Sequence, residues 1–264
     1  MSAHSTEWSV ETAAEVLLRA ERTRTDRHPV TEDWPDLDVA TAYRVQDALL
    51  ARRVAAGEKV VGVKLGLTSE AKQQRMGIDS PLTAWLTDAM VLEAGAPIPT
   101  GELIHPRVEP EIVFVLGERL EGPGITAAGA LAAVESVYAG IEVIDSRFTD
   151  FRFALPDVVA DNASSARFVI GGIERSPEDL DLALEECVLY VGGTAVDSAT
   201  GAAVQGHPAQ ALALAANALA ERGLALEAGW IVLTGGMTDA VFVEPGKPIV
   251  AEFTNLGSVT VAGS

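Results

Sequence analysis

The sequence predicts an α+β fold in which a curved β-sheet assembly follows a helical N-terminal region. Helix-like periodicity occupies residues 9–24 and 39–57, joined by a Pro- and Asp-rich connection at 28–38, whereas short apolar runs punctuated by Gly, Pro and Asp dominate after residue 70. The chain has 264 residues, of which 48% are apolar and 22% charged, so it can build a sizeable core. We therefore expect a helical region at residues 1–70 packed on a β-rich domain at residues 71–264.

The helical region contains two expected helices and one strand. Ser9 is a suitable N-cap for a helix over residues 9–24, and Asp38 for a second helix over residues 39–57. Residues 59–69 then form a buried, strand-like run that leads into a turn.

The β-rich region contains two further expected helices and a hairpin. One helix is expected at residues 126–138, and the other at 208–222, with a proline in its first turn and a glycine just past its end. Residues 187–198 predict a β-hairpin that turns at Gly192 and Gly193.

The charge of the chain limits its partners. The formal net charge is −19, from 38 acids against 19 bases, which argues against nucleic acid or an anionic membrane as partner. The single cysteine, Cys187, cannot form an internal disulfide, and we expect it to be a buried structural thiol in a reducing cytoplasm. We expect neither a signal peptide nor a membrane span, because no apolar stretch is long enough.

Three carboxylates in apolar, strand-like segments are the leading functional candidates. Glu109 and Glu111 lie two residues apart, so they share one face of a strand, about 7 Å apart, and repel each other by about 2 kcal/mol. With Glu142 they would suit a hard divalent cation such as Mg²⁺ or Mn²⁺. Pro110, between the first two, indicates an edge strand or a bulge. The alternative is that these acids only solvate an exposed strand face.

Other polar residues are weaker candidates. Lys64 interrupts a buried run, where it could bind an anion or move a proton, or simply form an ion pair. Asp79 and the polar loop at residues 161–165 could be functional or serve only as turn residues. Neither a P-loop, a Rossmann glycine pattern, a G-x-S-x-G motif nor an H-E-x-x-H motif occurs.

Six segments together resemble the hydratase/decarboxylase branch of the fumarylacetoacetase superfamily. The resemblance covers nearly the whole chain from about residue 10, and the segments occur in order at plausible spacing. They are K-L-G-L-T-S (64–69), M-G-I-D-S-P (76–81), H-P-R-V-E-P-E-I (105–112), E-V-I-D-S-R (142–147), A-D-N-A-S-S (160–165) and G-H-P (206–208).

The resemblance implies a mixed β-roll fold of the fumarylacetoacetase C-terminal type, and an oligomer of identical chains. It implies that Mg²⁺ or Mn²⁺ is bound by the three glutamates. It further implies that Lys64 and Asp79 are catalytic and that Ser164 contacts the substrate.

Two lyase chemistries occur in that branch. One hydrates 2-hydroxypenta-2,4-dienoate, and the other decarboxylates the 2-oxo dicarboxylic acid 2-oxo-3-hexenedioate. Residues 145–153 and 235–241 resemble the decarboxylating members more closely, and the first of these segments offers Arg147 and Arg152 as substrate-binding cations or as structural ion pairs. The resemblance also suggests a complex with a homologous hydratase, and a non-catalytic partner subunit of such a hydratase is a further alternative.

Overall fold

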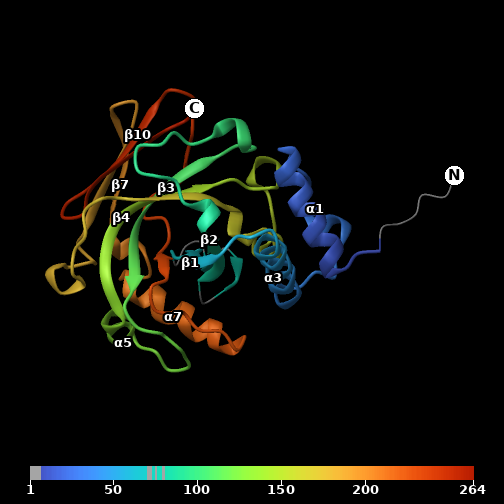
Figure 1. Ribbon diagram of the computed structural model, residues 1–264, viewed down its shortest axis with the longest axis horizontal. Coiled ribbons are helices and arrows are strands. Elements are labelled where there is room, and N and C mark those ends of the chain that lie inside the picture. Colours follow the sequence, from blue (N-terminus) through green and yellow to red (C-terminus); the bar gives the residue numbers. More distant parts are fainter. Residues whose placement is uncertain (1–6, 70–72, 75, 79–80) are drawn as a thin grey trace.

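Figure 1 shows the computed structural model, which describes residues 7–69, 73–74, 76–78 and 81–264. Within these residues the helices are α1 (Val10–Thr23), α2 (Val30–Asp33), α3 (Val39–Ala55), α5 (Ala127–Ala132), α6 (Leu155–Ala160) and α7 (Pro208–Glu221). The strands are β1 (Val60–Gly66), β2 (Leu82–Thr87), β3 (Arg107–Leu116), β4 (Val134–Ile144), β5 (Ser165–Ile170), β6 (Glu186–Val191), β7 (Thr194–Thr200), β8 (Ile231–Leu233), β9 (Val241–Phe242), β10 (Pro248–Phe253) and β11 (Gly257–Ala262). None of the described helices is long and apolar enough to cross a membrane.

Two sheets form the β-rich part. The larger has the order β2-β1-β8-β3-β4-β5, with the short β9 paired to β3. Its pairs are antiparallel except for β1 with β8. The smaller sheet is antiparallel, in the order β11-β10-β6-β7. Long, strongly curved β3 and β4 run through the middle of the molecule (Figure 1). Helix α7 packs against α5 and contacts β1 and β2. Helices and a curved mixed sheet confirm the predicted α+β class.

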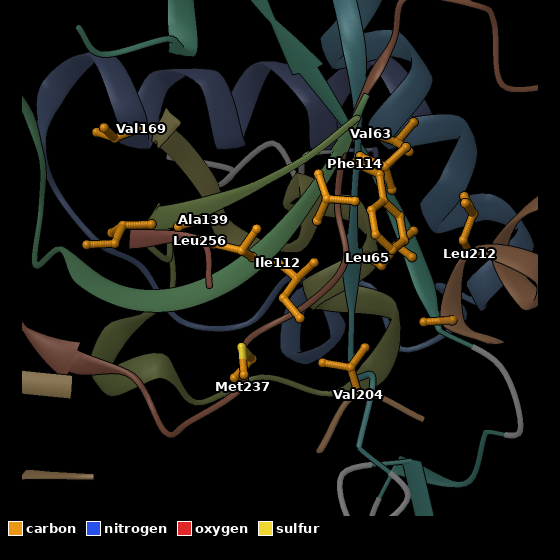
Figure 2. Close-up of a cluster of buried hydrophobic side chains, with 14 of the residues drawn as sticks. Val63, Leu65, Ile112, Phe114, Ala139, Val169, Val204, Leu212, Met237 and Leu256 are labelled. Atoms are coloured by element: carbon orange, nitrogen blue, oxygen red, sulfur yellow. The ribbon is translucent and has the colours of Figure 1, made fainter. Parts of the chain in front are cut away.

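The main hydrophobic core fixes one face of the strands that carry the candidate site. Val63 and Leu65 of β1, and Ile112 and Phe114 of β3, belong to it (Figure 2). Complete burial of each such side chain contributes about 1.5–3 kcal/mol. Because successive strand residues point to opposite faces, the residues between them face away from this core. That alternation orients Lys64 and the glutamates of β3.

The N-terminal helices form a second core against α6 and β2. Both predicted N-caps are confirmed: the Ser9 hydroxyl accepts from the Thr12 N–H at 3.2 Å, and Asp38 accepts from the Thr41 N–H at 2.7 Å. Helix α3 ends at Ala55, and β1, which also lies within residues 1–70, pairs with β2 in the large sheet. The predicted hairpin and the helix predicted at residues 208–222 are present as β6–β7 and α7.

Two local predictions are wrong. The helix expected over residues 126–138 ends at Ala132, because β4 begins at Val134 and pairs with β3, and this pairing overrides the helical propensity of an alanine-rich segment. Pro110 lies in neither an edge strand nor a bulge, since β3 pairs with β4 in unbroken register around it. Its carbonyl accepts from the Met237 N–H at 3.0 Å, so its missing N–H faces the β8–β9 loop, where the ladder needs no donor.

Candidate metal centre and adjoining cavity

Three glutamates from two neighbouring strands meet at one point. Glu109 and Glu111 project from the same face of β3, and the β3–β4 register places Glu142 directly opposite Glu109. One carboxylate oxygen from each lies within 4.8 Å of the other two. The structure therefore brings together the three residues that the sequence singled out as metal ligands.

The electrostatics of this cluster favour a cation. Glu111 and Glu142 are fully buried. Burial, and then the charges of Glu142 and Glu109, raise the pKa of Glu111 well above its usual value. One Glu111 oxygen accepts from the Gly235 N–H at 2.6 Å, whereas the other, Oε1, is buried without a hydrogen-bond partner. A buried carboxylate oxygen with no donor costs free energy unless a cation contacts it, which is what a metal ligand requires.

Lys64 stands beside the cluster as a paired, buried cation. Its Nζ lies 3.0 Å from Glu142 Oε2, and its side chain is 5% exposed. Burial lowers the pKa of Lys64, but the three glutamates outweigh burial and raise it, so the ammonium stays charged. Ser165 donates to the other oxygen of Glu142 at 2.9 Å. Three carboxylates and one ammonium carry a net charge of −2 when ionised, which a divalent cation neutralises.

A cavity of about 200 Å³ adjoins the cluster. Its polar lining includes Lys64, Glu109, Thr68 and Ser164. Most of the remaining wall is apolar and comes from Leu65, Leu67, Leu82, Ile144, Phe151, Phe153, Val158 and Ala163. A small molecule in this cavity would meet charge at one end and hydrocarbon along its length.

The two phenylalanines of this wall were not predicted. Phe151 is held in place by the Arg107 guanidinium, 4.1 Å from the ring centroid, and by the His105 ring at 4.8 Å. The guanidinium also stacks on Phe242 at 4.2 Å. The sequence did offer a signal, because Phe151 and Phe153 lie in the segment 145–153 that carried part of the family resemblance.

The Gly235–Gly236 pair was also missed as part of the site. Gly235 donates to Glu111, and a Cβ on Gly236 would come within 2.8 Å of the Glu109 carboxylate carbon. Gly236 therefore lets the backbone approach the Glu109 carboxylate. Gly235 is required by its φ of 111° and by the Thr68 side chain, which a Cβ would overlap. Adjacent glycines after a buried strand were the available signal.

The other predicted residues are placed as follows. Ser164 is buried, lines the cavity and lies 3.3 Å from Asp161 Oδ2 through its hydroxyl. Arg152 is exposed between Phe151 and Phe153 and makes no ion pair with the described part of the chain. Asp79 lies outside the described residues.

Arg147 does not reach the cavity, which corrects its predicted role in binding substrate. Its Nε donates to Asp161 Oδ1 at 2.5 Å, and its two Nη atoms donate to the carbonyls of Asp145 and Asp161 at 2.7 and 2.5 Å. Only 4% of Arg147 is exposed, and its side-chain donors bind Asp145 and Asp161 within the protein. The structural ion pair, which was the alternative, is the arrangement found.

Comparison with known proteins gives consistent results. The profile of the family described as fumarylacetoacetate (FAA) hydrolase C-terminal matches residues 59–262. A 4-oxalocrotonate decarboxylase of Pseudomonas sp. (strain CF600) is 45% identical over 247 residues, covering 94% of each chain. A 2-hydroxyhexa-2,4-dienoate hydratase of Comamonas testosteroni is 37% identical over 254 residues, covering 96% of each chain.

A solved structure extends this similarity to three dimensions. The 4-oxalocrotonate decarboxylase of Pseudomonas putida G7, complexed with magnesium and adipate, superposes with a TM-score of 0.94 at 42% identity and covers 97% of each chain. The predicted fold type is therefore confirmed over nearly the whole chain.

Proposed function

This chain belongs to the fumarylacetoacetate hydrolase C-terminal family, and on that premise we propose that it is a metal-dependent carboxy-lyase. Its substrate is 2-oxo-3-hexenedioate, also called 4-oxalocrotonate, and its product is 2-hydroxypenta-2,4-dienoate. The observation that carries the proposal is the cluster of Glu109, Glu111 and Glu142 beside a largely apolar cavity. Similarity to decarboxylases at 45% identity supports the choice of reaction.

The three glutamates would hold Mg²⁺ or Mn²⁺, and the unpartnered Glu111 oxygen fits that role. A bound divalent cation supplies Lewis acidity to the adjacent carboxylate and carbonyl oxygens of a 2-oxo acid. Magnesium is present in the structure of the 42% identical decarboxylase, which supports the assignment.

Lys64 is proposed to stabilise the charge that develops during the reaction. When the C5–C6 bond breaks, CO₂ leaves and the electron pair delocalises through C4 and C3 towards the C2 oxygen. The Lys64 ammonium, held 3.0 Å from Glu142, adds positive potential at that end of the cavity without having to reorganise. Ser164, which lines the cavity, would orient the substrate through its hydroxyl.

The apolar wall has a role in the loss of CO₂. Converting a carboxylate into neutral CO₂ is favoured where the surroundings solvate the charge poorly, and Phe151 and Phe153 provide such surroundings. Arg152, exposed between these rings, is our candidate for loose contact with the distal carboxylate. Tight pairing would stabilise the ground state and oppose decarboxylation. Asp79 remains a sequence-based candidate for moving a proton.

Hydration of 2-hydroxypenta-2,4-dienoate is the second candidate reaction, favoured by 37% identity to a hydratase over 96% of both chains. We further propose a homo-oligomer that associates with a homologous hydratase, and a cytoplasmic location. A non-catalytic subunit would keep its contacts with the hydratase but would not need the glutamate cluster.

Incubation with 4-oxalocrotonate and Mg²⁺, with CO₂ and dienoate measured, tests the proposal. We expect CO₂ release that stops on chelation and is restored by Mg²⁺. Water addition to the dienoate without CO₂ release from 4-oxalocrotonate would replace the decarboxylase by the hydratase. If the protein shows neither activity but still binds a hydratase, the non-catalytic subunit is favoured.

A further inference from the structure

The turn that carries Ser164 has an unusual backbone. Asn162, Ala163 and Ser164 have φ values of 49°, 48° and 60°, which place three successive non-glycine residues in the left-handed region. Ala163 and Ser164 line the cavity, and the next residue, Ser165, donates to Glu142. Such a conformation persists only where surrounding contacts enforce it. The contacts that enforce this turn therefore determine where two site hydroxyls lie.

Asp161 and Arg147 provide part of those contacts, beside the Asn162 amide, which pairs with the backbone of Trp85. The Asp161 carbonyl accepts from the Ser164 N–H at 3.0 Å, and the Asp161 carboxylate lies 3.3 Å from the Ser164 hydroxyl. Arg147 holds Asp161 from the other side, through its Nε to the carboxylate and its Nη2 to the carbonyl, both at 2.5 Å. Asp161 is fully buried, so this pair has no competing water.

The same network reaches the strands that carry the glutamates. The Asp145 N–H donates to the Ser164 carbonyl at 2.8 Å, just after the end of β4. The Asp145 carboxylate accepts from the N–H groups of Ile104 and His105 at 2.9 and 2.8 Å, just before β3 begins. The turn is thus joined to both strands through Asp145.

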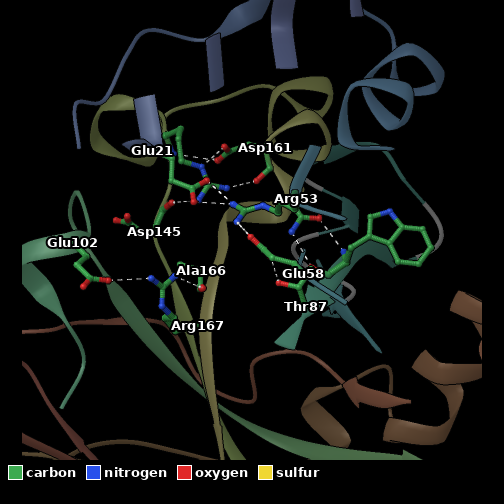
Figure 3. Close-up of polar contacts among 12 residues, drawn as sticks. Glu21, Arg53, Glu58, Thr87, Glu102, Asp145, Asp161, Ala166 and Arg167 are labelled. Atoms are coloured by element: carbon green, nitrogen blue, oxygen red, sulfur yellow. Dashed lines mark hydrogen bonds and ion pairs between the residues drawn. The ribbon is translucent and has the colours of Figure 1, made fainter. Parts of the chain in front are cut away.

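The N-terminal helices complete the enclosure. Glu21 of α1 accepts two bonds from Arg53 of α3, at 2.6 and 2.8 Å (Figure 3). Both side chains line a narrow cleft together with Arg147 and Asp161. Burial favours the neutral form of Glu21, but the charges of Arg147 and Arg53 outweigh burial and hold the pKa of Glu21 below its usual value. The helical layer therefore covers the polar network that supports the site.

We propose that Arg147 and Asp161 are positioning residues for the reaction. They enforce the left-handed turn that aims the Ser164 hydroxyl into the cavity and the Ser165 hydroxyl at Glu142. This inference rests on the proposed function, because it assigns Ser164 a contact with the substrate. A buried ion pair that only stabilises the fold is the competing explanation.

The test compares Asp161→Asn with Ser164→Ala and with the double variant. We expect Asp161→Asn to lower kcat by about tenfold or more, because small misplacements of a contacting group are costly, while Mg²⁺ affinity measured by calorimetry stays within about twofold. Adipate binding in the presence of Mg²⁺ should weaken in parallel. Because Asp161 acts through Ser164, the double variant should be no worse than the poorer single variant.

Glu185→Gln is the matched control. Glu185 is equally buried, and its carboxylate accepts from the N–H groups of Asn255 and Leu256, far along the chain from the turn. We expect it to lower Tm but to leave kcat and adipate binding unchanged. If Asp161→Asn does not fold, Arg147→Lys serves instead, since it keeps the charge but loses the fork-shaped contact.

The outcomes separate the two levels of the argument. A wild-type protein that binds Mg²⁺ and adipate but releases no CO₂ refutes the proposed function alone, and the loss of adipate binding in Asp161→Asn then still decides the inference. An active wild type whose Asp161→Asn variant keeps both kcat and adipate affinity, with only Tm lowered as in the control, refutes the positioning role. A double variant whose loss of kcat equals the product of the two single losses also refutes the positioning role.

Discussion

Replacing Glu111 by glutamine should separate metal binding from folding. The Glu111 oxygen lies within 4.8 Å of an oxygen of Glu109 and of Glu142, and each such pair, when ionised, repels by about 3.5 kcal/mol at an effective dielectric of 20. Glutamine removes this repulsion, and its carbonyl oxygen can still accept from the Gly235 N–H. The metal-free Glu111→Gln protein should therefore be at least as stable as the metal-free wild type.

The stabilisation by Mg²⁺, in contrast, should be lost in the Glu111→Gln variant. A ligand at about 100 times its Kd stabilises the native state by about 2.7 kcal/mol, which corresponds to a Tm rise of roughly 5–11 °C for a chain of this size. We expect such a rise with Mg²⁺ for the wild type and almost none for Glu111→Gln. Decarboxylation should be lost in the variant.

Thermal unfolding with and without Mg²⁺, beside a chelator, is the assay. Glu252→Gln, an exposed acid of β10, removes the same charge away from the site and should respond to Mg²⁺ as the wild type does. A metal-free Glu111→Gln protein that melts several degrees lower and still gains the full rise with Mg²⁺ would refute the reasoning.

Three further predictions concern single side chains. Lys64→Met should lower kcat by about 100-fold or more while Mg²⁺ affinity is kept or tightened, because the ammonium 3.0 Å from Glu142 is lost; equal losses in both would make Lys64 structural. His207 caps α7 by accepting from the Ala209 N–H at 3.0 Å, and burial lowers its pKa below 6.5. The unfolded state then binds the proton first, so stability should fall as the pH drops from about 7.5 to about 5.5, and urea unfolding should show less of this loss in His207→Asn. Cys187 is buried with its pKa raised to about 12, so a thiol reagent at about pH 8 should modify it only after denaturation.

The elements that the sequence predicted well are those with strong local signals. These signals fix the backbone through nearby atoms. They are the caps at Ser9 and Asp38, the glycine pair of the β6–β7 hairpin and the proline at the start of α7. The helix expected up to residue 138 failed because the pairing of β4 with β3 depends on residues about twenty positions away in the sequence. Pro110 failed for a similar reason, since only the β8–β9 loop explains why its missing N–H is tolerated.

The amino-acid sequence alone identifies the side chains that could form the site, because carboxylates and a lysine inside apolar runs are costly wherever the chain folds. How these side chains combine depends on the three-dimensional fold. The β3–β4 register set Glu142 opposite Glu109, and the packing of the turn turned Arg147 away from the cavity and towards Asp161. Register and side-chain direction depend on contacts between segments distant in sequence, and no local pattern encodes these.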